Sequence, residues 1–125
     1  MPTISDMRYI TIVYDVNTLS FVPWDGSISI GSQQASVASV TSVADTAAST
    51  ALLATNAARL GGSIYNDSSA LLYVLYGTGT ASASAYTARV YPNGFHTILG
   101  NYVGAIQGIW ATDPNDGSAR ITELS

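Results

Sequence analysis

The 125-residue sequence contains no cysteine, which excludes disulfide bonds and zinc sites built from thiolates. It contains no lysine either, so its four positive charges are all arginines. Charged residues make up 10% of the chain, against about 25% in an ordinary soluble domain. A surface with so few charges lacks the usual protection against association. We therefore expect part of this surface to be an interface.

The charge balance and the hydropathy pattern argue against two classes of partner. The net charge is −4, and four scattered arginines cannot form the basic patch that nucleic acids or anionic membranes require. No apolar run approaches the roughly 18 residues of a membrane-spanning helix. The first residues, MPTISDMR, include no apolar signal-peptide core. We expect a protein made in the cytoplasm that binds neither nucleic acid nor membrane.

Catalytic and metal-binding patterns are also scarce. His96 is the single histidine, so a cluster of histidine ligands is excluded and a catalytic triad has only one candidate base. No G-x-S-x-G sequence accompanies it. The run from Asp113 to Gly117 has oxygen ligands but lacks the spacing and terminal glutamate of a calcium loop, which favours a tight turn. We expect no enzyme, no metal and no cofactor.

The strongest structural signal is the run SIYNDSSALLYVLYG, from Ser63 to Gly77. Its polar centre lies between two runs of strand-forming residues, which predicts a β-hairpin. The second run is apolar on both faces of the strand: Ala70, Leu72, Val74 and Tyr76 alternate with Leu71, Tyr73 and Leu75. We expect a second sheet to cover one face and another element, with a second subunit as one candidate, to cover the other.

Further short strands separated by turn signals predict an all-β fold. Strands are expected at residues 37–43, 50–54, 82–91, 95–99, 105–111 and 120–124. Short strands at this spacing are typical of a small antiparallel β-sandwich or barrel. Between residues 35 and 60 a helix remains the alternative, because residues 47–54 are rich in alanine.

The N-terminal part differs in pattern from the rest. Residues 1–6 predict an irregular arm, and residues 8–14 and 19–22 predict two strands, the second closed by Pro23. The stretch SISIGSQQ, residues 27–34, has the composition of a linker. We therefore divide the chain into an arm and hairpin for attachment or oligomerisation at residues 1–34, and a β-sandwich module at residues 35–125.

Tyrosine occurs eight times, and it is the one residue type whose high frequency suggests a function. Such residues serve sugar-binding surfaces and subunit interfaces, and a core or interface role is the better account here. The aromatic surface could include Tyr65, Tyr73, Tyr76, Tyr86, Tyr91, Tyr102 and Trp110. The residues that we expect in an interface come from the arm and the central strand: Tyr9, Ile12, Tyr14, Phe21, Trp24, Leu71, Tyr73 and Leu75.

Several segments between Val40 and Leu124 form a composite pattern. They are Val40-Thr41-Ser42-Val43, Thr50-Ala51-Leu52-Leu53-Ala54-Thr55-Asn56, Ala58-Arg59, Ile64-Tyr65-Asn66-Asp67-Ser68-Ser69, Leu72-Tyr73-Val74, Gly77, Tyr86-Thr87, Gly104-Ala105-Ile106, Gly108-Ile109-Trp110 and Ala119-Arg120-Ile121-Thr122-Glu123-Leu124. With this pattern the stretch resembles a module of tailed-bacteriophage virion proteins, similar to capsid decoration (cement) proteins and to domains of head and tail fibres.

The resemblance implies a small β-sandwich that works by adhering to other virion proteins, without enzymatic activity. We expect a decoration protein on the outer head shell, with the major capsid protein as its partner and a homo-oligomer, in particular a trimer, as its assembly. The alternative is a head- or tail-fibre domain in which the tyrosines and Trp110 bind a host-surface glycan.

Overall fold

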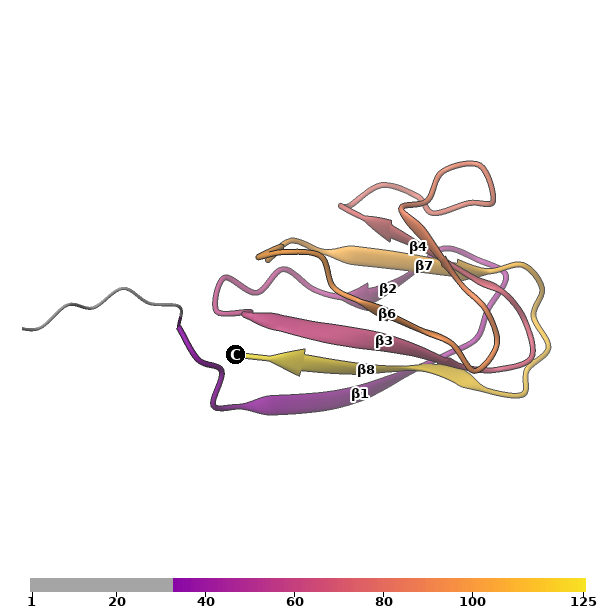
Figure 1. The fold of residues 1–125 in the computed structure, drawn as a ribbon. Helices are drawn as coiled ribbons and strands as arrows, with labels where there is room; N and C mark the ends of the chain where they lie inside the picture. The colour runs from indigo at the N-terminus through magenta and orange to yellow at the C-terminus, as the bar shows by residue number, and fades with distance from the viewer. Residues whose placement is uncertain (1–32) are drawn as a thin grey trace, which may run out of the picture. The chain divides into compact units, whose positions relative to one another are not determined.

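The computed structural model describes residues 33–125, which form eight β-strands and no helix (Figure 1). The all-β prediction is therefore confirmed for this part of the chain. The strands are β1 (Ala38–Ala44), β2 (Thr50–Leu53), β3 (Gly61–Asp67), β4 (Leu72–Tyr76), β5 (Ala88–Val90), β6 (Phe95–Thr97), β7 (Ile106–Trp110) and β8 (Ser118–Leu124).

The strands form two four-stranded antiparallel sheets packed as a sandwich rather than a closed barrel (Figure 1). Sheet A has the order β1-β8-β3-β6, and sheet B has the order β2-β7-β4-β5. The pairs β1–β8, β2–β7, β3–β6 and β4–β5 are nested, as if one long double-stranded ribbon were folded over. The pairs β3–β8 and β4–β7 then complete the sheets. This nested order is the topology of a jelly roll.

The predicted hairpin from Ser63 to Gly77 is wrong. Its two strands exist, but β3 pairs with β6 and β8 in sheet A, whereas β4 pairs with β5 and β7 in sheet B. The polar segment between them is an arch that crosses from one sheet to the other.

The hairpin prediction is wrong because of Asn66. Its side chain is fully buried, whereas a residue in a hairpin turn would be exposed to solvent. Its Nδ2 donates to the carbonyls of Ala70 (2.7 Å) and Val90 (2.8 Å). Its Oδ1 accepts from Trp110 Nε1 (3.2 Å) and from the Ser68 hydroxyl (2.8 Å). A buried amide is stable only when its polar atoms are paired, so these bonds hold the end of β3 against sheet B.

The predicted strand at residues 82–91 is also wrong over most of its length. Only Ala88–Val90 is a strand, and residues 77–87 form a loop that contains one isolated bridge between Ser82 and Ala85. Hydrogen bonds to serine hydroxyls hold this loop: Ser84 N–H donates to Ser82 Oγ, and Ala81 N–H donates to Ser49 Oγ. Local bonds such as the one from Ser84 to Ser82 compete with strand pairing.

The other strand predictions within the described part are confirmed with shifted ends. These are the strands expected at 37–43, 50–54, 95–99, 105–111 and 120–124. The helical alternative for residues 35–60 is wrong, because β1 and β2 occupy this segment. The predicted strands at 8–14 and 19–22 lie outside the described residues, and the division at residue 34 stays a prediction.

The core lies between the sheets and is made of inward-facing side chains from both. In β7, Ile106 and Trp110 are buried on either side of Gly108. A Cβ atom at Gly108 would lie 2.6 Å from Leu52 Cδ1, so glycine is required for this close approach. The other apolar side chains with 0% exposure are Ile64, Leu72, Val74, Ala119 and Ile121.

One charged side chain is buried at the end of the sandwich where β3 begins. Arg59 has a side-chain exposure of 0%, and its Nε donates to Glu123 Oε2 at 2.6 Å. Its Nη1 donates to the carbonyls of Gly104 (2.8 Å) and Tyr102 (3.3 Å), and its Nη2 donates to the carbonyl of Ala54 (2.6 Å). Arg59 therefore joins the β2–β3 loop, the β6–β7 loop and β8.

We expect Arg59→Met to lower the free energy of unfolding by about 3–5 kcal/mol, because it removes one partner of a buried ion pair. Glu123 and the carbonyl groups would lose their donors in the folded state. Urea unfolding followed by circular dichroism measures this change.

The matched control is Arg120→Met. Arg120 pairs with Asp67 at 2.8 Å, but both side chains are about half exposed (57% and 44%). An exposed pair contributes at most about 1 kcal/mol, so this variant should be close to the native protein in stability. Equal losses in the two variants would contradict the role assigned to Arg59.

Candidate interaction surface

The central strand β4 divides its side chains between the core and the outer face of sheet B. Leu72 and Val74 are fully buried, whereas Tyr73 and Leu75 are only partly buried. The alternation follows from the period of two in a β-strand. Leu71 precedes the strand on the same side as Tyr73 and is also partly buried.

The neighbouring strands extend this outer surface. Tyr73 lies directly opposite Ile109 of β7 on one side and opposite Arg89 of β5 on the other. Residues that are directly opposite in an antiparallel pair point to the same face. We call the contiguous set formed by Leu71, Tyr73, Leu75, Tyr86 and Ile109 the sheet-B face.

The loop between β4 and β5 covers part of the sheet-B face. The ring of Tyr86 packs on Tyr73 with 5.0 Å between centroids, and Tyr86 remains 39% exposed. The same loop brings Gly79 close to Leu75. In Figure 1 this loop projects from β4 at the top of the view. The second cover that the apolar strand was expected to need is thus supplied in part by the chain itself.

The structure brings Leu71, Tyr73 and Leu75 together, among the residues expected in an interface. The other five, Tyr9, Ile12, Tyr14, Phe21 and Trp24, lie outside the described residues. Sequence reasoning missed Ile109, although the alternation in residues 105–111 could have indicated it. It placed Tyr73 and Tyr86 in one aromatic surface, but their direct packing was not predicted, because the intervening loop has no regular period.

Four other aromatic residues of the described part lie away from the sheet-B face. Trp110 is buried in the core at 1% exposure. Tyr76 and Tyr102 stack on each other with centroids 4.7 Å apart. Tyr65 lies in sheet A, opposite Phe95 and Arg120, on the outer face of that sheet.

The outer face of sheet A carries exposed apolar side chains, but they are separated. Val40 is 67% exposed on β1, and Phe95 is 69% exposed on β6, at the opposite edge of the sheet. Strands β8 and β3 lie between them and carry the ion pair of Arg120 with Asp67. Isolated exposed apolar residues are normal on a protein surface, so the sheet-B face is the stronger candidate.

His96 of β6 in sheet A joins the two sheets through a contact with Tyr76 of β4 in sheet B. Its Nε2 lies 2.8 Å from the hydroxyl of Tyr76, and that hydroxyl accepts a hydrogen bond from Leu99 N–H (2.8 Å). The tautomer of the neutral imidazole determines which of the two groups, the Tyr76 hydroxyl or Nε2, donates this bond. Partial burial lowers the pKa of His96 below its ordinary value and raises the pKa of Tyr76.

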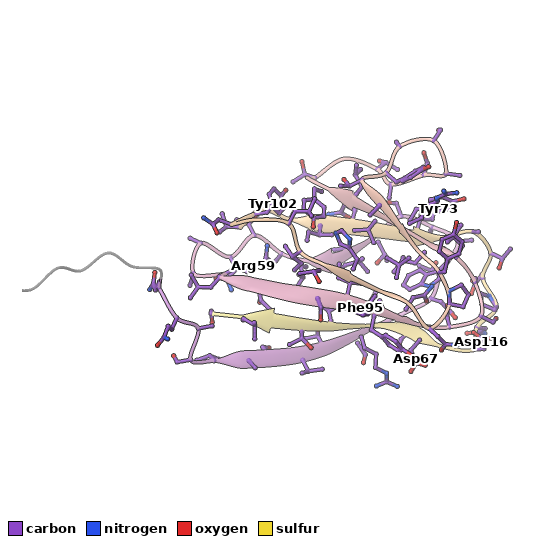
Figure 2. The ribbon with its side chains drawn as sticks, in the orientation of Figure 1. Arg59, Asp67, Tyr73, Phe95, Tyr102 and Asp116 are labelled. Atoms are coloured by element: carbon purple, nitrogen blue, oxygen red, sulfur yellow. The ribbon has the colours of Figure 1, made fainter. Side chains whose placement is uncertain are left out.

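Polar side chains gather at the opposite end of the sandwich from Arg59 and Tyr102, around Asp67 and Asp116 (Figure 2). A depression of about 380 Å³ is lined there by Asp67, Ser68, Ser69, Pro92, Asn93 and Asp116. Hydrogen bonds from the hydroxyl and N–H of Ser69 lower the pKa of Asp116. Within residues 33–125, no three His, Cys, Asp or Glu side chains are grouped so as to hold a metal ion.

No family model matches this chain, and neither a curated protein nor a solved structure does. The described part of the chain also has no helix that is long and apolar enough to cross a membrane. The assignment of function therefore depends on the geometry of the chain itself.

We expect His96 to make stability depend on pH. The folded protein holds the imidazole neutral, whereas the unfolded chain takes up a proton near the ordinary pKa of 6.5. The stabilisation is therefore fully present above pH 6.5 and is lost as the pH falls through the lowered folded-state pKa. His96→Gln removes this titration, so its deficit in melting temperature relative to the native protein should shrink from about pH 7.5 to about pH 5.

Thermal unfolding of both proteins across this pH range measures the difference. Because each comparison is made at one pH, the lowered pKa of Asp116 affects both proteins alike. A deficit that stays constant, or grows toward low pH, would contradict the neutral state assigned to His96.

Proposed function

We propose that this chain is a structural protein of a tailed-bacteriophage virion, a decoration protein that binds and stabilises the outer shell of the head. The observation that carries the proposal is the sheet-B face, a contiguous apolar and aromatic surface centred on Tyr73. It belongs to a chain in which only 10% of the residues are charged. The major capsid protein is the proposed partner.

The fold supports this proposal by analogy only. Jelly-roll sandwiches occur in viral capsid domains and also in lectin domains, and one fold can carry unrelated functions. The analogy agrees with the resemblance of residues 40–124 to phage virion modules, which was drawn from the sequence. Each is compatible with adhesion to other virion proteins.

The proposed mechanism is burial of apolar surface on a shell of many copies. A contact through the sheet-B face contributes roughly 25 cal/mol for each Å² of apolar area buried, before the cost of association. Tyrosines and other rigid aromatic residues are well suited to such contacts, because they bury much area at a small cost in side-chain entropy. A subunit that also binds its neighbours gains further affinity through avidity.

Because the chain has few charges, we expect binding through the sheet-B face to depend little on ionic strength. Arg89 lies opposite Tyr73 on the sheet-B side, and its guanidinium lies over the exposed ring of Tyr91 at 5.8 Å from the centroid. A contact dominated by apolar burial changes little with ionic strength, whereas a contact between charged patches weakens. Binding should therefore persist in high salt.

A fibre domain that binds a host-surface glycan is the second candidate. The specific observation in its favour is the pair of Tyr73 and Tyr86, whose rings are tilted by 52° and partly exposed. Aromatic rings at a protein surface can stack on the apolar faces of sugars. The same residues would then bind a sugar in place of a shell protein.

The test is to measure binding of the purified chain to phage heads that assemble without it. Tyr73→Ser removes the central ring of the sheet-B face, and loss of such a residue typically costs about 2 kcal/mol or more, or roughly 30-fold in Kd. Tyr65→Ser is the matched control, because Tyr65 is a partly buried tyrosine on the outer face of sheet A. It should bind as the native chain does.

Native-like melting curves for both variants establish that the changes are local. Native affinity in Tyr73→Ser, or equal losses in both variants, would exclude the sheet-B face. Failure of the native chain to bind heads would overturn the decoration role. Glycan binding that is lost in Tyr73→Ser would then favour the fibre domain.

A further inference from the structure

The longest free strand edge of the described part belongs to β1. This strand of seven residues is the outermost strand of sheet A and pairs with β8 along one edge only. No strand within residues 33–125 pairs with its other edge. A free edge presents unpaired N–H and C=O groups in a row, which is a template for another strand.

The hydrogen bonds define which groups of β1 are free. Val37 and Ser125 exchange two bonds (2.9 and 2.8 Å), and Asp45 N–H donates to the Gly117 carbonyl in the same register. In an antiparallel pair every second residue directs both backbone groups to the same neighbour, so the odd-numbered residues of β1 bond to β8. The even-numbered residues direct theirs to the free edge: Ala38, Val40, Ser42 and Ala44.

The edge of β1 lacks the features that usually prevent an edge strand from pairing with another strand. The sequence of β1, ASVTSVA, contains no charge, no proline and no glycine. Every residue except Val43 is exposed, so no other element within residues 33–125 covers most of the strand on either face. Charged side chains, prolines and bulges are the usual means by which a protein protects an edge strand. In β1 none of these is present.

We propose that β1 pairs antiparallel with β1 of a second copy of this chain, about a two-fold axis at Thr41. In this register Ala38 lies opposite Ala44 of the second copy, and Val40 lies opposite Ser42 of the second copy. All four residues with free backbone groups then exchange hydrogen bonds across the axis. The two A sheets become one continuous sheet.

The choice of a second copy as the partner follows from length and from charge. The other outer strands of the two sheets are short: β2 has four residues and an irregular register, and β5 and β6 have three residues each. Pairing with any of these would leave part of β1 unpaired. The β1 strand of a second copy has the same length, and because β1 carries no charge, the two copies pair without electrostatic repulsion. Such a contact uses the same surface on both subunits and closes as a dimer.

This dimer goes beyond the proposed function, because it uses sheet A and leaves the sheet-B face free. It also differs from the trimer that the sequence analysis expects. Two-fold pairing of β1 occupies the edge completely, so it does not extend to a third subunit.

Sedimentation equilibrium of the full chain between about 1 and 200 μM tests the proposal. The native chain should be a dimer whose dissociation can be followed on dilution. Thr41→Lys places like charges next to the axis, where the two Cα atoms are about 4.5 Å apart, and should raise the dimer Kd at least about tenfold. Thr41→Val is the matched control and should dimerise as the native chain does.

Amide hydrogen exchange measured by NMR provides a second test that depends on the register. At high protein concentration the amides of Ala38, Val40, Ser42 and Ala44 should be protected, and dilution should remove this protection. Val40→Pro should abolish it, because the proline replaces an N–H that makes no bond to β8. The amides of Ser39, Thr41 and Val43 should stay protected in the variant, which shows that the sandwich remains folded.

Three results would overturn the proposal. The first is a native chain that stays monomeric across the whole concentration range. The second is an oligomer whose stability neither Thr41→Lys nor Val40→Pro lowers. The third is protection of the even-numbered amides of β1 that does not change with concentration, since it would mean that the chain covers this edge itself.

Discussion

The buried guanidinium of Arg59 is the interaction on which the geometry of the sandwich most depends. It holds Glu123 of β8 and backbone carbonyls from the β2–β3 and β6–β7 loops at one end of the fold. Asn66 has the corresponding role at the other end of β3, where its side-chain amide forms hydrogen bonds with backbone carbonyls and with Trp110. Paired polar groups thus fix both ends of the strand, to sheet B at Asn66 and to the two loops at Arg59.

Within residues 33–125 the apolar core is closed at both ends by buried hydrogen bonds. Arg120 with Asp67 is an exposed ion pair on the surface of this part. The consequence is a module whose outer faces are available for apolar and backbone contacts. The sheet-B face offers aromatic area, and the edge of β1 offers backbone hydrogen bonds. Both properties suit a protein that works by association.

The sequence predicted the strands better than their pairing. Runs of β-branched and aromatic residues locate most strands, and the alternation of Leu71, Tyr73 and Leu75 with Leu72 and Val74 correctly separates the two faces of β4. The hairpin was wrong because Asn66 bonds to Val90 and Trp110, which are distant in sequence and leave no local signal. Nor does composition reveal that Arg59 is buried whereas Arg89 and Arg120 are exposed.

The most direct test of the decoration role is the copy number of this polypeptide relative to the major capsid protein in purified phage particles. Quantitative mass spectrometry with labelled reference peptides measures this ratio. The account predicts a ratio near unity or a simple fixed fraction of it, as for a protein that covers the shell. A few copies per particle would instead indicate a fibre or tail component, and absence from the particle would contradict a virion role altogether.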